Sequence, residues 1–150
     1  IRISLCVVAS GCAGAGPHPP TEQDRAAPCL SDPASLAERA AQVGSGPPGA
    51  LESAGLLLSE TAFREWITAA GGAEQADWLW DAHRQDLEYG LKNLRECGAG
   101  NFVIGIPRSV DGPAKGYKIP VDAICADGTA IDFRVKALLF KECLYVGAIN

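Results

Sequence analysis

The stretch YKIPVDAICADGTAIDFRV, residues 117–135, decides the fold because it predicts a β-hairpin with a fixed register. Apolar and polar residues alternate on both sides of Ala-Asp-Gly at 126–128, the pattern of two half-buried strands around a turn. A three-residue loop with its glycine in the left-handed conformation sets Val121 opposite Phe133, whereas a two-residue loop would set Asp122 opposite Phe133. We therefore predict the three-residue loop. Its register also pairs Cys125 with Thr129, Ala123 with Ile131 and Ile119 with Val135.

This register divides the hairpin into an apolar face and a charged face. The apolar face carries Tyr117, Ile119, Val121, Ala123, Cys125, Ile131, Phe133 and Val135, and the charged face carries Lys118, Asp122, Asp132, Arg134 and Lys136. Asp122 faces Asp132 across the strands, a like-charge pair that is mildly unfavourable unless Arg134 intervenes diagonally. The apolar face is predicted to be buried.

Two further runs complete a predicted antiparallel meander of four strands. The strands are expected over residues 101–107, 116–125, 129–140 and 143–149, with Gly, Pro and Asp between them. The last long run loses its strict alternation near Leu138, which indicates a bulge, or a turn at Lys141-Glu142.

The residues before the meander have helical periodicity. Ser31 or Asp32 can cap a helix over 33–43 that begins at Pro33 and stops at a left-handed Gly44. A second helix follows Ser59 and ends at Gly71, and the longest begins after it and ends at Gly98. The apolar stripe of the longest helix carries Trp80, Leu87, Leu91 and Leu94, with Ala76 and His83 close by. The prediction is an α+β fold with N-terminal helices packed on a C-terminal antiparallel β-meander.

The order of elements over residues 33–150 resembles that of cystatin-like and NTF2-like α+β domains. The resemblance implies a meander curled around the longest helix, with a pocket between sheet and helices that serves small-molecule binding, partner binding or catalysis. On that expectation the candidate pocket residues are Trp80, His83, Tyr117 and Phe133.

The N-terminus has the features of an export signal. Arg2 precedes the apolar run ISLCVVAS, residues 3–10, which suits a signal peptide and is too short to span a bilayer. Ala9-Ser10-Gly11-Cys12 then resembles the lipobox of bacterial lipoproteins, which implies that Cys12 is lipidated and becomes the mature N-terminus. Ordinary signal peptidase cleavage nearby and a buried N-terminal strand are the alternatives.

The three segments that follow from this interpretation are residues 1–12 as signal peptide with lipobox, 13–30 as flexible tether and 31–150 as the single α+β domain. The tether is predicted because its opening, rich in Gly, Pro and Ala, has no apolar periodicity. The resemblance to lipoproteins implies a lipid-anchored protein of the cell envelope, facing the periplasm if the host is Gram-negative.

Four cysteines remain outside the predicted signal. Cys29, Cys97, Cys125 and Cys143 are an even number in an oxidising compartment, so two disulfides are expected, with all three pairings open. We predict no metal site, since no pair has metal-ligand spacing and the chain has two histidines.

Composition limits the classes of partner. The 13 Lys and Arg against 18 Asp and Glu are scattered and give a net charge of −5, which argues against nucleic acid. Mean hydropathy near zero argues against a polytopic membrane protein. No nucleophile elbow, phosphate loop or Cys–His pair is recognisable, and no cofactor is predicted.

The favoured hypothesis is a non-catalytic envelope lipoprotein that binds a protein partner or a small apolar ligand. The first alternative is a pocket enzyme of hydrolase or isomerase type, with His83 as acid or base beside Asp81 or Asp86. It requires His83 to point into a cavity with a second polar group within hydrogen-bond reach. The second alternative is an immunity- or inhibitor-type lipoprotein, which would present an exposed patch.

Overall fold

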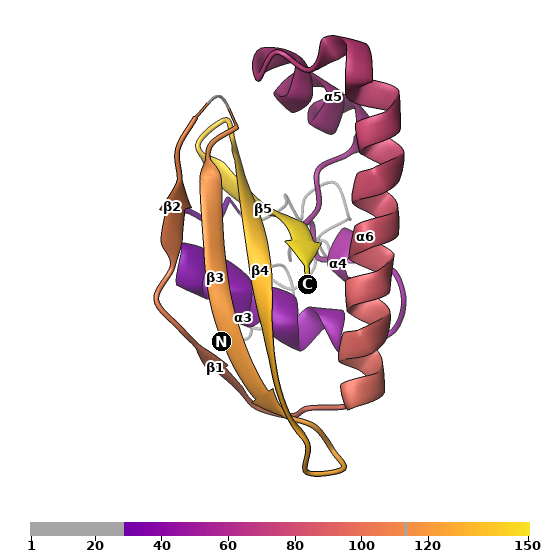
Figure 1. Cartoon of the computed structure of the whole chain (residues 1–150), viewed down its shortest axis with the longest axis vertical. Helices are drawn as coiled ribbons and strands as arrows, with labels where there is room; N and C mark the ends of the chain where they lie inside the picture. The colour runs from indigo at the N-terminus through magenta and orange to yellow at the C-terminus, as the bar shows by residue number, and fades with distance from the viewer. Residues whose placement is uncertain (1–28, 113) are drawn as a thin grey trace, which may run out of the picture.

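The structure is a computed structural model, and it describes residues 29–112 and 114–150. Helices come first and an antiparallel sheet follows, so the predicted α+β class is confirmed (Figure 1). The helices are α3 Pro33–Gly44, α4 Ala50–Ser53, α5 Glu60–Ala69, the 3-10 helix η2 Ala73–Gln75 and α6 Ala76–Cys97. The strands are β1 Phe102–Ile104, β2 Arg108–Val110, β3 Gly116–Ile124, β4 Ala130–Phe140 and β5 Cys143–Ile149. The predicted signal peptide 1–12 with Cys12, and residues 13–28 of the predicted tether, lie outside the described residues.

The β3–β4 hairpin has the predicted register. Val121 pairs with Phe133, and Asp122 pairs with Asp132. Gly128 has a φ of 89°, the left-handed conformation that the three-residue loop requires. The carboxylate of Asp127 accepts a hydrogen bond of 2.9 Å from the backbone N–H of Thr129 and so stabilises the turn.

The first strand of the meander was predicted over 101–107, and this prediction is wrong. β1 ends at Ile104, β2 begins at Arg108, and both pair with the same edge of β3. Three residues, 105–107, lie opposite two residues of β3, so the edge carries a bulge. Pro120 of β3 accepts a hydrogen bond from Gly105 but has no N–H to return, and the ladder breaks there.

The last two strands contain a bulge and also a turn at Lys141-Glu142, the two irregularities that the sequence offered as alternatives. The β4–β5 register shifts between Lys136 and Ala137, which is the bulge. Lys141 and Glu142 then form a tight turn with φ values of 48° and 67°, as the hairpin's right-handed twist favours.

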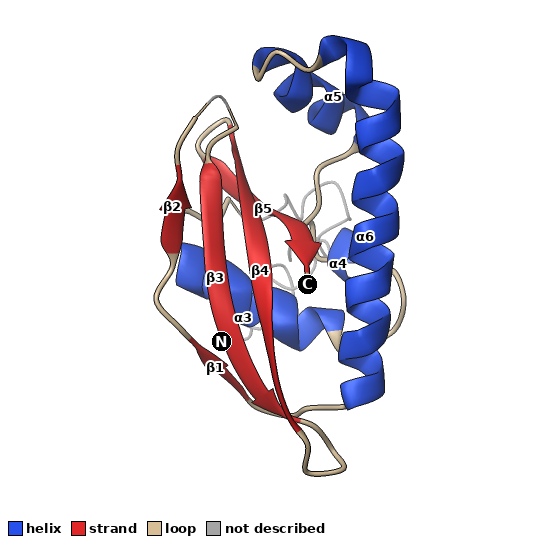
Figure 2. Ribbon diagram, in the orientation of Figure 1, coloured by secondary structure: helices blue, strands red, loops and turns tan. Residues whose placement is uncertain are grey.

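Helix α3 covers one face of the sheet. It contacts β1, β3, β4 and β5, and in Figures 1 and 2 it crosses behind the strands. Asp32 caps it by accepting a hydrogen bond of 3.0 Å from the backbone N–H of Ser35. Its sheet-facing side consists of Leu36, Ala37, Ala40 and Ala41, all fully buried, and the three alanines permit a close approach. The helix that crosses the sheet is therefore the short α3, where the resemblance implied the longest helix.

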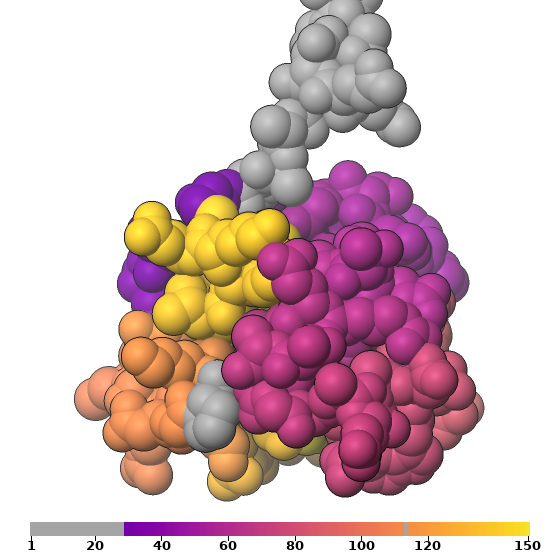
Figure 3. Space-filling view, turned by 90° about the horizontal axis from the view of Figure 1, so that it is seen from above, coloured from indigo at the N-terminus to yellow at the C-terminus, as the bar shows by residue number. Residues whose placement is uncertain are grey.

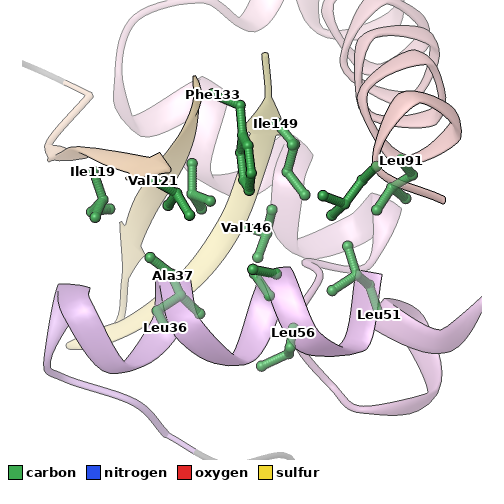
Figure 4. Packing of buried hydrophobic residues seen from close by; sticks show 14 of the residues in the cluster. Leu36, Ala37, Leu51, Leu56, Leu91, Ile119, Val121, Phe133, Val146 and Ile149 are labelled. Carbon is green, nitrogen blue, oxygen red and sulfur yellow. The ribbon is translucent and has the colours of Figure 1, made fainter. Parts of the chain in front are cut away.

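The main core lies between α3, the sheet and α6. Figure 4 shows Leu36 and Leu56 below the strands, Val121 and Val146 between the layers, and Leu91 reaching in from α6. Gly44 was predicted to stop α3 in a left-handed conformation, and this prediction is wrong. Gly44 is the last residue of the helix, keeps a helical conformation and is buried. A Cβ there would lie 2.9 Å from Leu91 and 3.2 Å from Leu94 of α6, so this glycine lets the two helices meet.

A second, smaller core joins α5 and the start of α6 to β4 and β5 close to the turn that connects these two strands. Phe63 and Ile67 of α5 are buried there, with Leu138, Phe140 and Tyr145 packed against them. The view from above shows the helical segment that contains α5 side by side with the ends of the strands (Figure 3).

Two disulfides join distant parts of the chain. Cys29 bonds Cys143, and Cys97 bonds Cys125, which confirms that all four candidate cysteines are paired. Leu30 forms a bridge with Leu144 of β5, so the last two residues of the predicted tether are attached to the folded domain. No helix of the described residues has the length and apolar character needed to cross a membrane.

Candidate functional site

The four predicted pocket residues do not line one cavity. Trp80 and His83, on successive turns of α6, line a recess of about 290 Å³ against residues 49–60. Phe133 lines a different recess of about 420 Å³, between the C-terminal half of α6 and the β3–β4 hairpin. Tyr117 packs against the main core from β3. The structure therefore brings Trp80 and His83 together and leaves Phe133 and Tyr117 apart from them.

His83 is held between aromatic side chains. Its ring stacks on Phe63 of α5, with 4.7 Å between centroids and 17° between planes, and its centroid lies 5.6 Å from that of Trp80. Burial lowers the pKa of His83, and a hydrogen bond to the backbone of Gly147 only partly opposes this effect. Burial therefore favours the neutral imidazole, and its ring packs against Phe63 and Trp80.

Two of the polar side chains that line the recess with His83 are engaged with α5. Ser59, which also lines the recess, caps α5 by accepting a hydrogen bond of 3.1 Å from the N–H of Ala62. Glu60 binds Arg64 with oxygen-to-nitrogen distances of 2.8 and 3.2 Å. Among the residues that the structure describes, no side chain forms a hydrogen bond with His83. Glu52, Arg84 and Glu88 also line the recess, and none of these described side chains forms the hydrogen bond with His83 that an acid–base pair needs.

The lowered pKa of His83 predicts how stability varies with pH. The unfolded chain takes up this proton near the ordinary value of 6.5, whereas the folded chain takes it up only at lower pH. Stability is therefore expected to fall as pH drops from about 7 through 6.5 toward the lowered value. Thermal melting of the wild type and of H83N across this range measures the effect. The melting temperature of H83N should depend less on pH, and equal slopes would contradict the assignment.

The opposite face of the sheet from α3 is a second candidate surface. No helix of residues 29–112 or 114–150 covers it at β3, where side chains that alternate with the core residues are exposed: Lys118, Pro120, Asp122 and Ile124 (Figures 1 and 2). We call this surface, with the exposed neighbours on β1, β2, β4 and the 105–107 bulge, the open sheet face. Two recesses lie on it. One of about 500 Å³ is lined by Ile106, Arg108, Lys118, Pro120 and Arg134, and one of about 580 Å³ includes Val103, Asp122, Ile124 and Asp132 in its lining.

The open sheet face combines exposed apolar residues with charges sorted into rows. Val103, Ile106 and Ile124 are 67%, 83% and 59% exposed, although aliphatic side chains of this size are normally buried. Lys118 of β3 pairs with Arg108 of β2 on one side and Lys136 of β4 on the other. In the next row on this face Arg134 lies opposite Pro120, and in the row after it Asp122 lies opposite Asp132, so Arg134 stands between the cationic row and the acidic row.

Sequence reasoning identified the charged side of the hairpin but missed Arg108 and Ile106. Ile106 lies in the bulge at 105–107 and Arg108 follows it, and the extra residue changes which side chains of this edge point outward. The signals in the sequence were Gly105 and Pro107 in the segment itself and Pro120, which has no N–H to donate to this edge.

The described part of the chain contains no group of three His, Cys, Asp or Glu side chains placed to hold a metal ion. Comparison with protein-family models, curated proteins and solved structures finds no match to this chain.

Proposed function

We propose that this chain is an exported, lipid-anchored envelope protein whose disulfide-bonded domain binds a protein partner through the open sheet face. The observation that carries the proposal is the exposure of Val103, Ile106 and Ile124 on a face of the sheet that no helix of the described residues covers. Exposed aliphatic groups that gather on one surface and are bordered by charges are characteristic of interaction sites.

A protein partner suits this face better than a small apolar ligand does. Small-molecule sites enclose most of their ligand's surface within a concave, mostly apolar cavity. The two recesses of the open sheet face are instead lined in part by the charged side chains of Arg108, Lys118, Asp122 and Asp132. An inhibitor- or immunity-type role is a special case of this proposal, in which the partner is an enzyme or a toxin.

The enzyme alternative rests on His83 in its recess. Its second requirement is a polar group within hydrogen-bond reach. Ser59 and Glu60 are engaged with α5, and the other polar side chains of the recess, Glu52, Arg84 and Glu88, form no hydrogen bond with His83 among the described residues. We therefore place the binding role first.

The envelope location is supported by the lipobox resemblance at Ala9-Ser10-Gly11-Cys12 and by two disulfides, which form in oxidising compartments. The intact mass of the protein purified from membranes tests it. We expect a chain that begins at Cys12 and carries lipid, and a mass gain of about 4 Da on reduction of its two disulfides. A mature chain that retains Ile1 would overturn the lipid anchor.

Photocrosslinking in the native envelope tests the binding face. A photoreactive phenylalanine analogue replaces Ile106 or Ile124 on the open sheet face, or Tyr89 on α6 as a control of similar exposure. The expected result is one discrete crosslinked product from both sheet positions and none from Tyr89. A product from Tyr89 alone would place the interface on α6, and no product from any position would contradict the binding role.

A further inference from the structure

We infer, resting on the binding role proposed above, that the partner presents an acidic segment to the open sheet face. The acidic segment binds at the cationic cluster, which we define as four residues on the adjacent strands β2, β3 and β4: Arg108, Lys118, Arg134 and Lys136.

The register places these cations against one another. Lys118 is directly opposite Arg108 on one side and Lys136 on the other, and neighbouring strands lie only about 4.8 Å apart. Arg134 is two residues from Lys136 on the same face of β4 and diagonal to Lys118. Like charges directly opposite each other destabilise a sheet. Lys118 therefore faces repulsion from both neighbouring strands.

None of the four cations forms an ion pair with a carboxylate of residues 29–112 or 114–150. Elsewhere in the same protein, cations do find such partners. Arg64 contacts Glu60 and Asp77, Lys92 contacts Glu96, and Lys141 contacts Glu65. The whole chain has an excess of acidic residues, with a net charge of −5. The four cations of the open sheet face therefore have no carboxylate partner among the described residues, and an acidic segment of the partner protein supplies one.

The surroundings of the cluster favour a protein segment over an anionic membrane. Asp122 and Asp132 form a row on the same face, four residues from Lys118 and Lys136 along their strands, and a uniformly anionic bilayer would be repelled there. A protein segment can place its carboxylates over the cations only. Ile106 and Pro120 line the same recess as Arg108, so apolar groups beside the carboxylates also find contacts.

Binding of a fluorescein-labelled octamer of L-glutamate to the full-length, disulfide-bonded chain tests the inference by fluorescence anisotropy. Replacement of Lys118 and Lys136 by glutamine is expected to weaken binding at least tenfold, and binding to the wild type should weaken as salt rises from 50 to 300 mM, since exposed charges are screened. The matched control, R39Q/K92Q, removes two exposed cations from α3 and α6 and should remain within about twofold of the wild type. Thermal melting of K118Q/K136Q should be unchanged or about 1–2 °C higher, since a repulsive row is removed.

Several results would overturn the inference. Equal weakening in both double variants would show unspecific attraction to positive charge. Tighter binding to phosphatidylglycerol vesicles than to the peptide, lost in K118Q/K136Q, would assign the face to a membrane. A dimer in light scattering that K118Q/K136Q disperses would assign it to a second copy of the chain. Crosslinking through Ile106 that is unaffected by K118Q/K136Q would refute the acidic segment and leave the proposed binding role intact.

Discussion

Replacing Gly90 by alanine is expected to lower the free energy of unfolding by about 2–4 kcal/mol, at the upper end of the cost of overpacking a core. Gly90 lies on the buried side of α6, where the helix backbone touches the end of β5. A Cβ at this position would overlap the carbonyl oxygen of Ile149 and lie 3.1 Å from its Cβ. Because the obstacle is backbone, α6 would have to move away from the strand. The higher helix propensity of alanine returns only about 1 kcal/mol.

Urea or thermal unfolding measures this effect, with an expected loss of roughly 10 °C in melting temperature. The control is Gly100→Ala, since a Cβ at Gly100 would meet no atom within 4 Å. Its free energy of unfolding should stay within about 0.5 kcal/mol of the wild type. If G90A is as stable as G100A, α6 and β5 do not have the close contact that the structure shows.

The hairpin, the start of α3 and the end of α6 could be predicted from the sequence because local rules determine them. Alternation on both strands leaves one register that keeps apolar residues together, and Gly128 supplies the turn. Asp32 caps the start of α3 and Gly98 caps the end of α6, each through a hydrogen bond with a backbone group three or four residues away. These features do not depend on the rest of the fold.

The features that could not be predicted depend on contacts between distant segments. The broken edge strand follows from the missing N–H of Pro120 on its neighbour, and the buried Gly44 follows from the crossing of α3 and α6. The candidate pocket failed to assemble for the same reason. The side of α6 that carries Trp80 and His83 faces residues 49–60 and α5, whereas Tyr117 belongs to the core under α3.

Disulfide pairing is another property of the whole fold. Cys125 follows β3, and Cys97 ends α6, 28 residues earlier in the chain. The hydrogen bond of 2.8 Å from the N–H of Ala126 to the carbonyl of Cys97 holds these two ends together. Cys29 is brought to Cys143 by the bridge between Leu30 and Leu144. No spacing rule in the sequence could choose this connectivity among the three.

Removal of either disulfide is expected to cost several kcal/mol, because each closes a long loop of the unfolded chain. By the loop-entropy relation, the bond that spans 114 residues contributes about 4.8 kcal/mol and the one that spans 28 contributes about 3.6 kcal/mol. A small domain has only about 5–15 kcal/mol of net stability. The variants C29A/C143A and C97A/C125A should therefore each melt at least roughly 10 °C below the wild type.

Reduction of the wild type provides the matched comparison. The reduced wild type should melt near the variant that lacks all four cysteines, and reductant should not change the melting of that variant. C29A/C143A should be the less stable of the two double variants, since its missing bond spans the longer loop. A reverse order would indicate that the native contact between α6 and the β3–β4 hairpin depends directly on Cys97–Cys125. A wild type that melts equally with and without reductant would show that neither bond stabilises the domain.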